Sequence, residues 1–287
     1  MGKNSRSNKS APVPNGALVI IGGAEDRDNN QDKRQARHLE ILSGFLKLSK
    51  ARHPVIEVVT SAASDEPEKT FEDYKNSFAS ICKCTVNHIY HSAREDVKIE
   101  EIRTRLNAAD AVFMSGGDQL RLTSIYGGTE FLQILKDRYI FDRLVVGGTS
   151  AGAMALSTPM IYAGVGRDEL IAGNVKATMG MEFLKDVCID THFVDRGRFV
   201  RMAQVIATNP SSIGIGIEEN TALVVTGGLN AEVLGFGVVI IIDARKSLNS
   251  NVVEFDDEIP ISIRGLQVDI LGKGDKYNIP QMNEPHH

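Results

Sequence analysis

The chain has 287 residues, of which 42% are hydrophobic and 24% are charged, as in a globular protein with a sizeable core. Its formal net charge of −5 argues against a nucleic-acid partner, because such a surface needs an excess of basic residues to displace counterions from phosphates. No stretch approaches the roughly eighteen apolar residues of a membrane span, so we expect no membrane partner either.

The first sixteen residues are polar and rich in serine and proline, which predicts a disordered segment at 1–16 rather than a signal peptide. We expect a single α/β domain over 17–279 and a flexible tail at 280–287. The three cysteines, Cys82, Cys84 and Cys188, lack the number for a disulfide framework and the spacing of a zinc site. We therefore predict a cytoplasmic protein with no metal.

Short apolar runs alternate with stretches of helical spacing in the first part of the chain. Residues 39–46, 71–81 and 131–139 have the helical pattern, and the alternation predicts a mainly parallel sheet with helices on both faces. After about residue 220, strand-like segments with breaks at Gly227-Gly228 and Lys273-Gly274 predict an antiparallel C-terminal extension. The runs interpreted as strands are 17–21, 55–60, 111–114, 144–146, 212–217, 222–225, 232–242, 261–263 and 268–271.

One strand end carries the pattern of a nucleophile elbow. Residues 145–153, VVGGTSAGA, give an apolar strand, a G-x-S-x-G turn around Ser150 and a small-residue helix start. Functional groups gather beyond the carboxyl ends of parallel strands, and a strained turn there would expose the Ser150 hydroxyl. The N–H of Ala151, at the helix start, is placed to donate to an oxyanion. A plain glycine-rich turn is the alternative interpretation.

A nucleophilic serine needs a base, and His192 is the best placed of the seven histidines. It follows the apolar residues 187–189, whereas the others lie in tails, connectors or an edge strand. A structural or solvated histidine is the alternative.

The base in turn needs a carboxylate to orient it. Glu218 and Glu219 end another apolar run, and adjacent side chains on an extended segment point to opposite sides, so only one of them can face His192. Asp190 and Asp195 remain alternatives by spacing alone. The order serine, histidine, acid differs from that of α/β-hydrolases and argues against a lipase or esterase.

Residues 115–119, SGGDQ, follow the strand at 111–114. Two glycines permit close approach of the backbone, so an N–H of Gly116 or Gly117 can supply a second oxyanion donor, and Gln119 can hydrogen-bond substrate. A tight turn with a helix cap at Asp118 is the alternative.

Arg196, Arg198 and Arg201 bring three guanidinium groups close together just after His192 in a chain that is acidic overall. Such a cluster suits the capture of carboxylates and would indicate an acidic substrate. A solvated run of charges explains the same pattern.

The chain from about residue 16 to 239 resembles the cyanophycinase branch of the serine peptidases related to aspartyl dipeptidase. Several separated motifs carry the resemblance: GGAED, SGGDQ, GTSAGA, DTHF followed by DRGR and Arg201, and GIGIEEN. It implies a flavodoxin-like core shared with class I glutamine amidotransferases. It also implies an exopeptidase that releases β-Asp-Arg dipeptides from cyanophycin, a poly-aspartate carrying arginine on each β-carboxyl, without metal or cofactor, and a homodimer.

Carried over by position, the resemblance makes Ser150 the nucleophile, His192 the base and Glu219 its partner. We take Gly117 and Ala151 as the oxyanion donors. Thr191 stands where the family usually has glutamine. We expect this shorter side chain to change the details of substrate binding. An α-aspartyl dipeptidase and a non-catalytic module for an acidic ligand are the alternatives. The positions that we expect to contact substrate are Gln119, Asp190, Thr191, Arg196 and Arg201.

Overall fold

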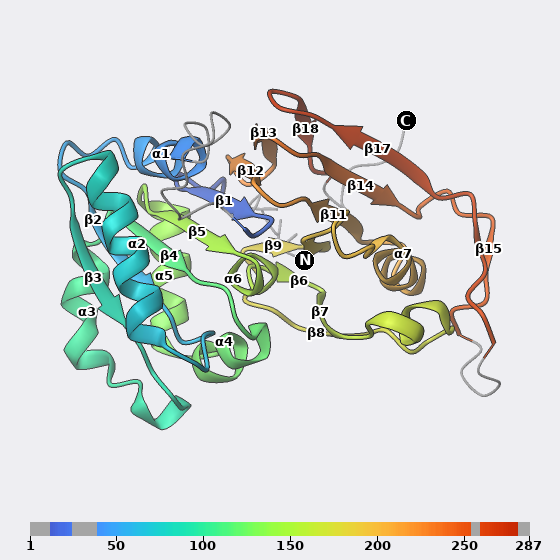
Figure 1. Ribbon diagram of the computed structural model, residues 1–287, viewed down its shortest axis with the longest axis horizontal. Helices are drawn as coiled ribbons and strands as arrows, with labels where there is room; N and C mark the ends of the chain where they lie inside the picture. The colour runs from blue at the N-terminus through green and yellow to red at the C-terminus, as the bar shows by residue number, and fades with distance from the viewer. Residues whose placement is uncertain (1–11, 25–38, 254–258, 281–287) are drawn as a thin grey trace, which may run out of the picture.

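The computed structural model describes residues 12–24, 39–253 and 259–280. Most of the predicted disordered segment 1–16 and nearly all of the tail 280–287 lie outside the described residues. Glu25 and Asp26 of the GGAED motif lie outside them as well. Two large β-sheets organise the part of the chain that is described (Figure 1).

The larger sheet has eight strands in the order β18-β13-β12-β1-β5-β4-β2-β3. Neighbours from β1 to β3 in this order pair in parallel, and the remaining three strands add antiparallel. The predicted parallel core with an antiparallel C-terminal addition is therefore present. The strands are β1 (Ala17–Ile21), β2 (Val55–Val59), β3 (Thr85–Ile89), β4 (Ala111–Met114), β5 (Val145–Thr149), β12 (Thr221–Thr226), β13 (Asn230–Gly235) and β18 (Lys276–Asn278).

The second sheet has six strands in the order β17-β14-β11-β10-β6-β9, and the parallel pair β10 and β11 lies at its centre. Two short two-stranded pairs, β7 with β8 and β15 with β16, complete the described strands. The strands of the second sheet are β6 (Ser157–Thr158), β9 (Leu184–Lys185), β10 (Val187–Thr191), β11 (Ile213–Ile217), β14 (Val239–Asp243) and β17 (Gln267–Leu271). The short pairs are β7 (Met160–Ala163), β8 (Lys176–Thr178), β15 (Asn249–Ser250) and β16 (Ile263–Arg264).

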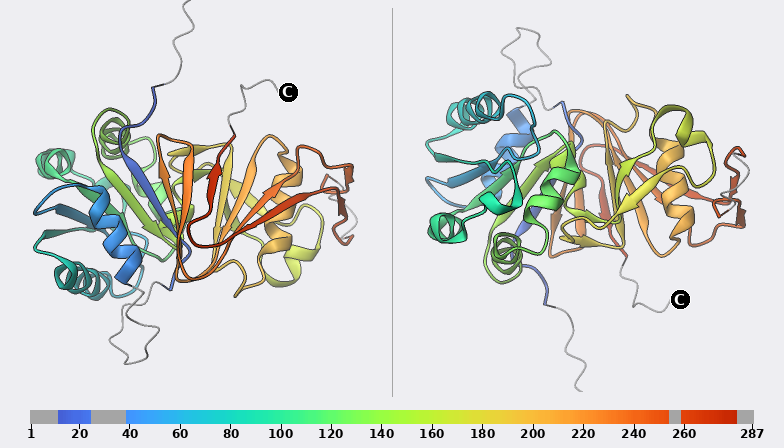
Figure 2. Two further views of the ribbon diagram at one scale, coloured as in Figure 1. Left: turned by 90° about the horizontal axis from the view of Figure 1, so that it is seen from above. Right: turned by 90° about the horizontal axis from the view of Figure 1, so that it is seen from below.

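Helices cover both faces of the parallel part of the larger sheet (Figure 2). Side chains alternate along a strand, so Val19 and Ile21 pack under α1 and α2, whereas Leu18 and Ile20 belong to the core shared with α3, α4 and α5. Helix α7 packs on the second sheet, against β10, β11 and β14. The helices are α1 (Leu39–Leu48), α2 (Pro67–Ile81), α3 (Ile99–Ala108), α4 (Gln119–Tyr126), α5 (Glu130–Phe141), α6 (Ala151–Met154) and α7 (Phe199–Thr208), with 3-10 turns at Arg94–Asp96 and Gly166–Leu170.

The second sheet is the main difference from the sequence prediction, which treated residues 232–242 as one strand-like run. These residues form β13 and β14, which belong to different sheets, because the chain turns at Gly235 (φ 102°). The break at Gly227-Gly228 joins a true hairpin, β12 and β13. The hairpin predicted at Lys273-Gly274 is wrong, because this turn joins β17 and β18, which belong to different sheets and do not pair with each other.

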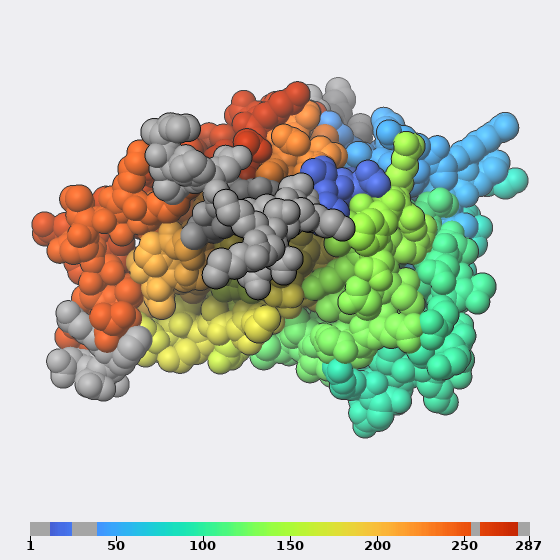
Figure 3. All heavy atoms as spheres, turned by 180° about the vertical axis from the view of Figure 1, so that it is seen from behind, coloured from blue at the N-terminus to red at the C-terminus, as the bar shows by residue number. Residues whose placement is uncertain are grey.

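The N-terminal and C-terminal parts of the chain lie toward opposite ends of the molecule. Seen from behind, cyan and green residues of the N-terminal half lie at one end, and orange residues of the C-terminal part lie at the other (Figure 3). Among the described helices, none has both the length and the apolar character that crossing a bilayer requires. The turns between the sheets are the place where the predicted site residues meet.

Candidate active site

Ser150 lies on a sharp turn between β5 and α6, with φ 50° and ψ −115°. Few non-glycine residues adopt a positive φ, so this backbone is strained and the surrounding packing must hold it. Two glycines allow that packing: a Cβ on Gly148 would lie 2.5 Å from the backbone of Gly152, and one on Gly152 would lie 2.3 Å from the Met114 carbonyl oxygen. The N–H of Ser150 donates to the carbonyl of Ile21 at 3.1 Å, which fixes the turn against β1.

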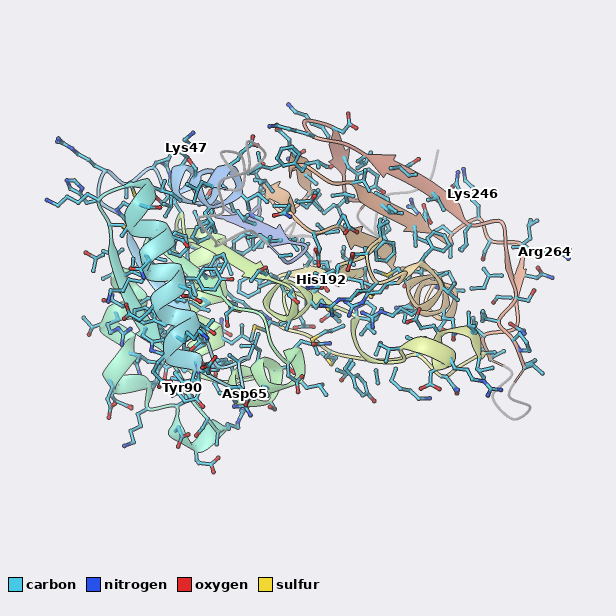
Figure 4. All side chains as sticks on the ribbon, in the orientation of Figure 1. Lys47, Asp65, Tyr90, His192, Lys246 and Arg264 are labelled. Carbon is cyan, nitrogen blue, oxygen red and sulfur yellow. The ribbon has the colours of Figure 1, made fainter. Side chains whose placement is uncertain are left out.

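His192 directly follows the carboxyl end of β10, a central strand of the second sheet, and its side chain lies against Ser150. Its Nε2 lies 3.0 Å from Ser150 Oγ. Its backbone N–H donates to the Gly22 carbonyl at 2.7 Å, and its φ is 48°. The residue is only 7% exposed, and Figure 4 places it in the middle of the molecule, between the two sheets. The imidazole is therefore fixed from both sides.

The two adjacent glutamates after β11 separate as expected for an extended segment. Glu219 Oε1 lies 2.5 Å from His192 Nδ1. Glu218 points elsewhere and accepts hydrogen bonds from the backbone N–H groups of Val194 and Asp195. Glu219, and not Glu218, thus completes a continuous chain of hydrogen bonds from carboxylate to imidazole to hydroxyl.

The SGGDQ loop lies beside Ser150. A Cβ on Gly116 would come 3.4 Å from Ser150 Cβ, and Gly117 has a φ of 139° that favours glycine. Asp118 caps α4 by accepting from the N–H of Leu120 at 2.8 Å, so the helix-cap interpretation is confirmed. The helix cap at Asp118 is therefore compatible with a glycine loop that lies beside Ser150. Ala151, on the other side of Ser150, is the first residue of α6.

Gln119 and Thr191 are held inside the structure. Gln119 is half-buried, and its Nε2 donates to the Ile161 carbonyl at 2.8 Å. Thr191 is fully buried, and its Oγ1 has no hydrogen-bond partner among the described residues. A buried hydroxyl ordinarily has a hydrogen-bond partner, so the Thr191 hydroxyl, next to His192 in the chain, is an exception.

The arginine cluster divides into buried and exposed members. Arg201 is 4% exposed and binds the fully buried Asp190 through Nε at 2.6 Å and Nη2 at 2.5 Å. Arg198 donates to Asp190 at 3.1 Å and to the Thr191 carbonyl at 2.8 Å. Burial lowers the pKa of Arg198, and the neighbouring arginines add to that effect while Asp190 opposes it. Arg196 is exposed and forms no side-chain hydrogen bond or ion pair within the described part of the chain.

Gly22 and Gly23 belong to the GGAED motif, for which the sequence predicted no individual role. A Cβ on Gly23 would lie 2.3 Å from His192 Cε1, and one on Gly22 would lie 2.0 Å from the Glu218 carbonyl oxygen. These glycines let the imidazole and the glutamate turn approach the end of β1. The pair of glycines after an apolar strand was the available signal. Within the described residues, no three or more His, Cys, Asp or Glu side chains are grouped to hold a metal ion.

The site has the arrangement typical of serine hydrolases. A serine on a strained strand-to-helix turn is hydrogen-bonded to an imidazole, which is hydrogen-bonded to a carboxylate. The model of Peptidase family S51 matches residues 18–233. The chain belongs to this family, and it is a serine peptidase.

Curated relatives agree with the family. The chain is 34% identical over 264 residues to a protein named "Cyanophycinase" from Synechococcus elongatus, covering 92% of this chain and 79% of that protein. It is 30% identical over 273 residues to a "Cyanophycinase" from Geminocystis herdmanii, covering 91% and 93%. A crystal structure of a peptidase from an acI-B1 Actinobacterium has a TM-score of 0.65 at 21% identity, covering 93% of this chain and 98% of that one, and supports the fold alone.

Proposed function

We propose that this protein is a cyanophycinase that hydrolyses cyanophycin to β-Asp-Arg dipeptides through an acyl-enzyme on Ser150. The observation that carries the proposal is the unbroken chain of hydrogen bonds from Glu219 through His192 to Ser150, with contacts of 2.5 and 3.0 Å. The similarity to curated cyanophycinases over about nine tenths of the chain supports the choice of substrate.

The first half of the proposed reaction acylates the serine. His192 Nε2 takes the proton of Ser150 as Oγ attacks the peptide carbonyl carbon. Glu219 then faces an imidazolium and stabilises its charge. Ala151 follows Ser150 directly, and Gly117 follows Gly116, which lies beside Ser150. We assign the N–H groups of Ala151 and Gly117 as the donors to the developing oxyanion. The tetrahedral intermediate collapses when His192 gives its proton to the leaving amine, which breaks the C–N bond.

The second half restores the enzyme. Water enters in place of the amine, His192 takes one of its protons, and the oxygen attacks the ester carbon. The same oxyanion donors act again. Collapse of this intermediate returns the proton to Ser150 Oγ and releases the new carboxylate. Protons and electrons balance without metal or cofactor.

The proposed substrate contacts gather around His192. Arg196 is the exposed guanidinium, so we assign it the capture of an aspartate carboxylate. Asp190 and Arg201 bind each other, and we propose that this pair forms the wall behind that contact. Gln119, which follows the glycine loop and is half-buried, completes the proposed contacts. Thr191 was expected to contact substrate as well, but it is fully buried, so we assign it to the packing behind His192.

The proposal is tested by incubating purified protein with insoluble cyanophycin and identifying the products by mass spectrometry. We expect β-Asp-Arg as the main product and slow or no hydrolysis of Asp-Leu. Preferential hydrolysis of Asp-Leu would instead support an α-aspartyl dipeptidase. Folded protein that cleaves neither compound and does not react with a serine-directed phosphonate would support a non-catalytic binding module.

Three finer features extend this proposal. The parallel order of β1 to β5 with helices on both faces is compatible with a flavodoxin-like core. The three cysteines are free, which is compatible with a reducing cytoplasm. We also propose a homodimer, which sedimentation equilibrium would test.

A further inference from the structure

A second cluster of polar side chains lies at the carboxyl end of β2, apart from the chain that joins Glu219 to Ser150. Tyr126, the last residue of α4, is fully buried, and its hydroxyl lies 2.7 Å from Ser61 Oγ and 2.8 Å from His91 Nδ1. Ser61 is also fully buried, and its Oγ accepts from the backbone N–H of His91 at 2.9 Å. Three residues thus close a ring of hydrogen bonds.

The ring of hydrogen bonds is closed with either tautomer of His91. Burial lowers the pKa of His91, so its imidazole is neutral near pH 7 and can accept at Nδ1. With Nδ1 as the acceptor, the Tyr126 hydroxyl donates to His91 and the Ser61 hydroxyl donates to Tyr126. With the proton on Nδ1, both donations reverse, and the ring stays closed. Burial also raises the pKa of Tyr126, which keeps its hydroxyl proton in place. Every member of the ring is satisfied, and such networks hold their residues rigidly.

The backbone beside Ser61 supports the start of α4. The carbonyl of Ser61 accepts from Arg121 Nε at 3.1 Å, and the carbonyl of Ala62 accepts from the N–H of Asp118 at 3.0 Å. A Cβ on Gly117 would lie 2.1 Å from the Ala62 carbonyl oxygen, so the backbone of Gly117 rests directly on that group. The position of Ala62 therefore sets the position of the glycine loop.

Gly116 and Gly117 have no side chains that could fix their own peptide planes. An oxyanion donor must lie within about half an ångström of its productive position to stabilise the transition state. The loop touches Ser150 on one side, as the 3.4 Å approach of a Cβ on Gly116 shows, and Ala62 on the other. Whatever fixes Ala62 thereby fixes the direction of the Gly117 N–H.

We propose that Tyr126, through Ser61 and Ala62, is a positioning residue for the oxyanion loop Gly116-Gly117. The inference rests on the proposed function, since it assumes that Gly117 donates to the oxyanion. Tyr126 contacts no substrate in this account. Its loss is expected to lower the rate of the chemical step and to leave the binding of uncleaved substrate unchanged.

The test is Tyr126→Phe, which removes one buried hydroxyl, with Tyr139→Phe as the matched control. Tyr139 is 3% exposed and its hydroxyl has no hydrogen-bond partner in the described structure, so its loss breaks no network. We expect kcat on cyanophycin to fall about tenfold in Tyr126→Phe, with KM within about twofold, because the donor is displaced and not removed. Tyr139→Phe is expected to keep the wild-type kcat. Ser61→Ala, which breaks the same ring, serves as a second variant if Tyr126→Phe fails to fold.

Two further readouts separate positioning from a general loss of structure. An acetylated aspartyl peptide aldehyde forms a hemiacetal whose oxygen occupies the oxyanion position, so its affinity is expected to fall by the same factor as kcat. The affinity for uncleaved cyanophycin, measured in a Ser150→Ala background, is expected to stay the same. The Tyr126→Phe and Ser61→Ala effects are expected to be less than additive, since both act through one ring.

A folded Tyr126→Phe with wild-type kcat would overturn the inference, as would a lower kcat with unchanged affinity for the aldehyde. Equal losses in Tyr126→Phe and Tyr139→Phe would also overturn it. These outcomes differ from a failure of the proposed function, which would appear as full activity of Ser150→Ala. An inactive Ser150→Ala together with a fully active Tyr126→Phe would contradict the positioning role of Tyr126 and leave the proposed function standing.

Discussion

Two groups of side chains near the end of β10 are built in different ways. In the first, Ser150 and Glu219 each contact one nitrogen of the His192 imidazole, and both are partly exposed. In the second, Asp190 and Arg201 form an ion pair that is fully or nearly fully buried. The group of Ser150, His192 and Glu219 can exchange protons with water and substrate. The opposite charges of Asp190 and Arg201 neutralise each other inside the protein. Substitutions in the first should reduce turnover, and those in the second should first reduce stability.

Among the variants that test this difference, Glu219→Gln is expected to lose the most activity. An amide cannot stabilise the imidazolium and favours the wrong tautomer, so kcat is expected to fall by roughly 10³ to 10⁴. The free energy of unfolding should change little. Glu218→Gln is the matched control, because an amide oxygen can still accept from the N–H groups of Val194 and Asp195. Steady-state kinetics on cyanophycin would measure both, and equal losses in the two variants would contradict the assignment.

Arg201→Met tests the buried side of the comparison. Removing one partner leaves the Asp190 carboxylate buried with part of its pairing lost, which is expected to cost about 3–5 kcal/mol of unfolding free energy. Arg196→Met is the matched control and is expected to change stability by less than about 0.5 kcal/mol, since Arg196 is exposed. Urea unfolding followed by circular dichroism measures both. A stable Arg201→Met would show that the ion pair is not what holds this region.

Gly23→Ala asks whether the position of the imidazole matters independently of its chemistry. The added methyl would meet His192 Cε1 at 2.3 Å, so the ring must move, and kcat is expected to fall roughly a hundredfold. Gly274→Ala is the control for backbone strain, because its φ is also positive but a Cβ there meets nothing within 4 Å. If both variants lost the same activity, strain and not the displaced imidazole would be the cause.

The smallest effect is expected for Arg196→Ala. Loss of one charge-assisted contact to an aspartate carboxylate should raise KM about tenfold while kcat changes less. Arg196→Lys should recover part of the loss, because a point charge replaces a two-pronged donor. Initial rates across a range of cyanophycin concentrations measure both parameters. An unchanged KM in Arg196→Ala would remove this residue from the substrate contacts.

Much of the site could be predicted because its residues follow strand ends. Ser150 and His192 each come directly after a strand, and the alternation along an extended segment separates Glu218 from Glu219. Periodicity also located β1, β4 and the helices α1 and α5 to within a few residues.

Other features depend on contacts that spacing does not encode. The two sheets were not separated, because an apolar run such as β11 does not reveal which neighbour it pairs with. The arginine cluster was treated as one group, yet α7 begins at Phe199 and turns Arg201 inward while Arg196 stays outside. The ring of Ser61, His91 and Tyr126 joins three elements, and no local pattern marks it.

The most direct test of the account compares wild-type protein with Ser150→Ala on cyanophycin, after both are shown to be folded. We predict release of β-Asp-Arg by the wild type and a loss of about 10⁴ or more in kcat for Ser150→Ala, with binding to the polymer retained. Release of the dipeptide by Ser150→Ala at a rate close to that of the wild type would contradict the central role of the serine.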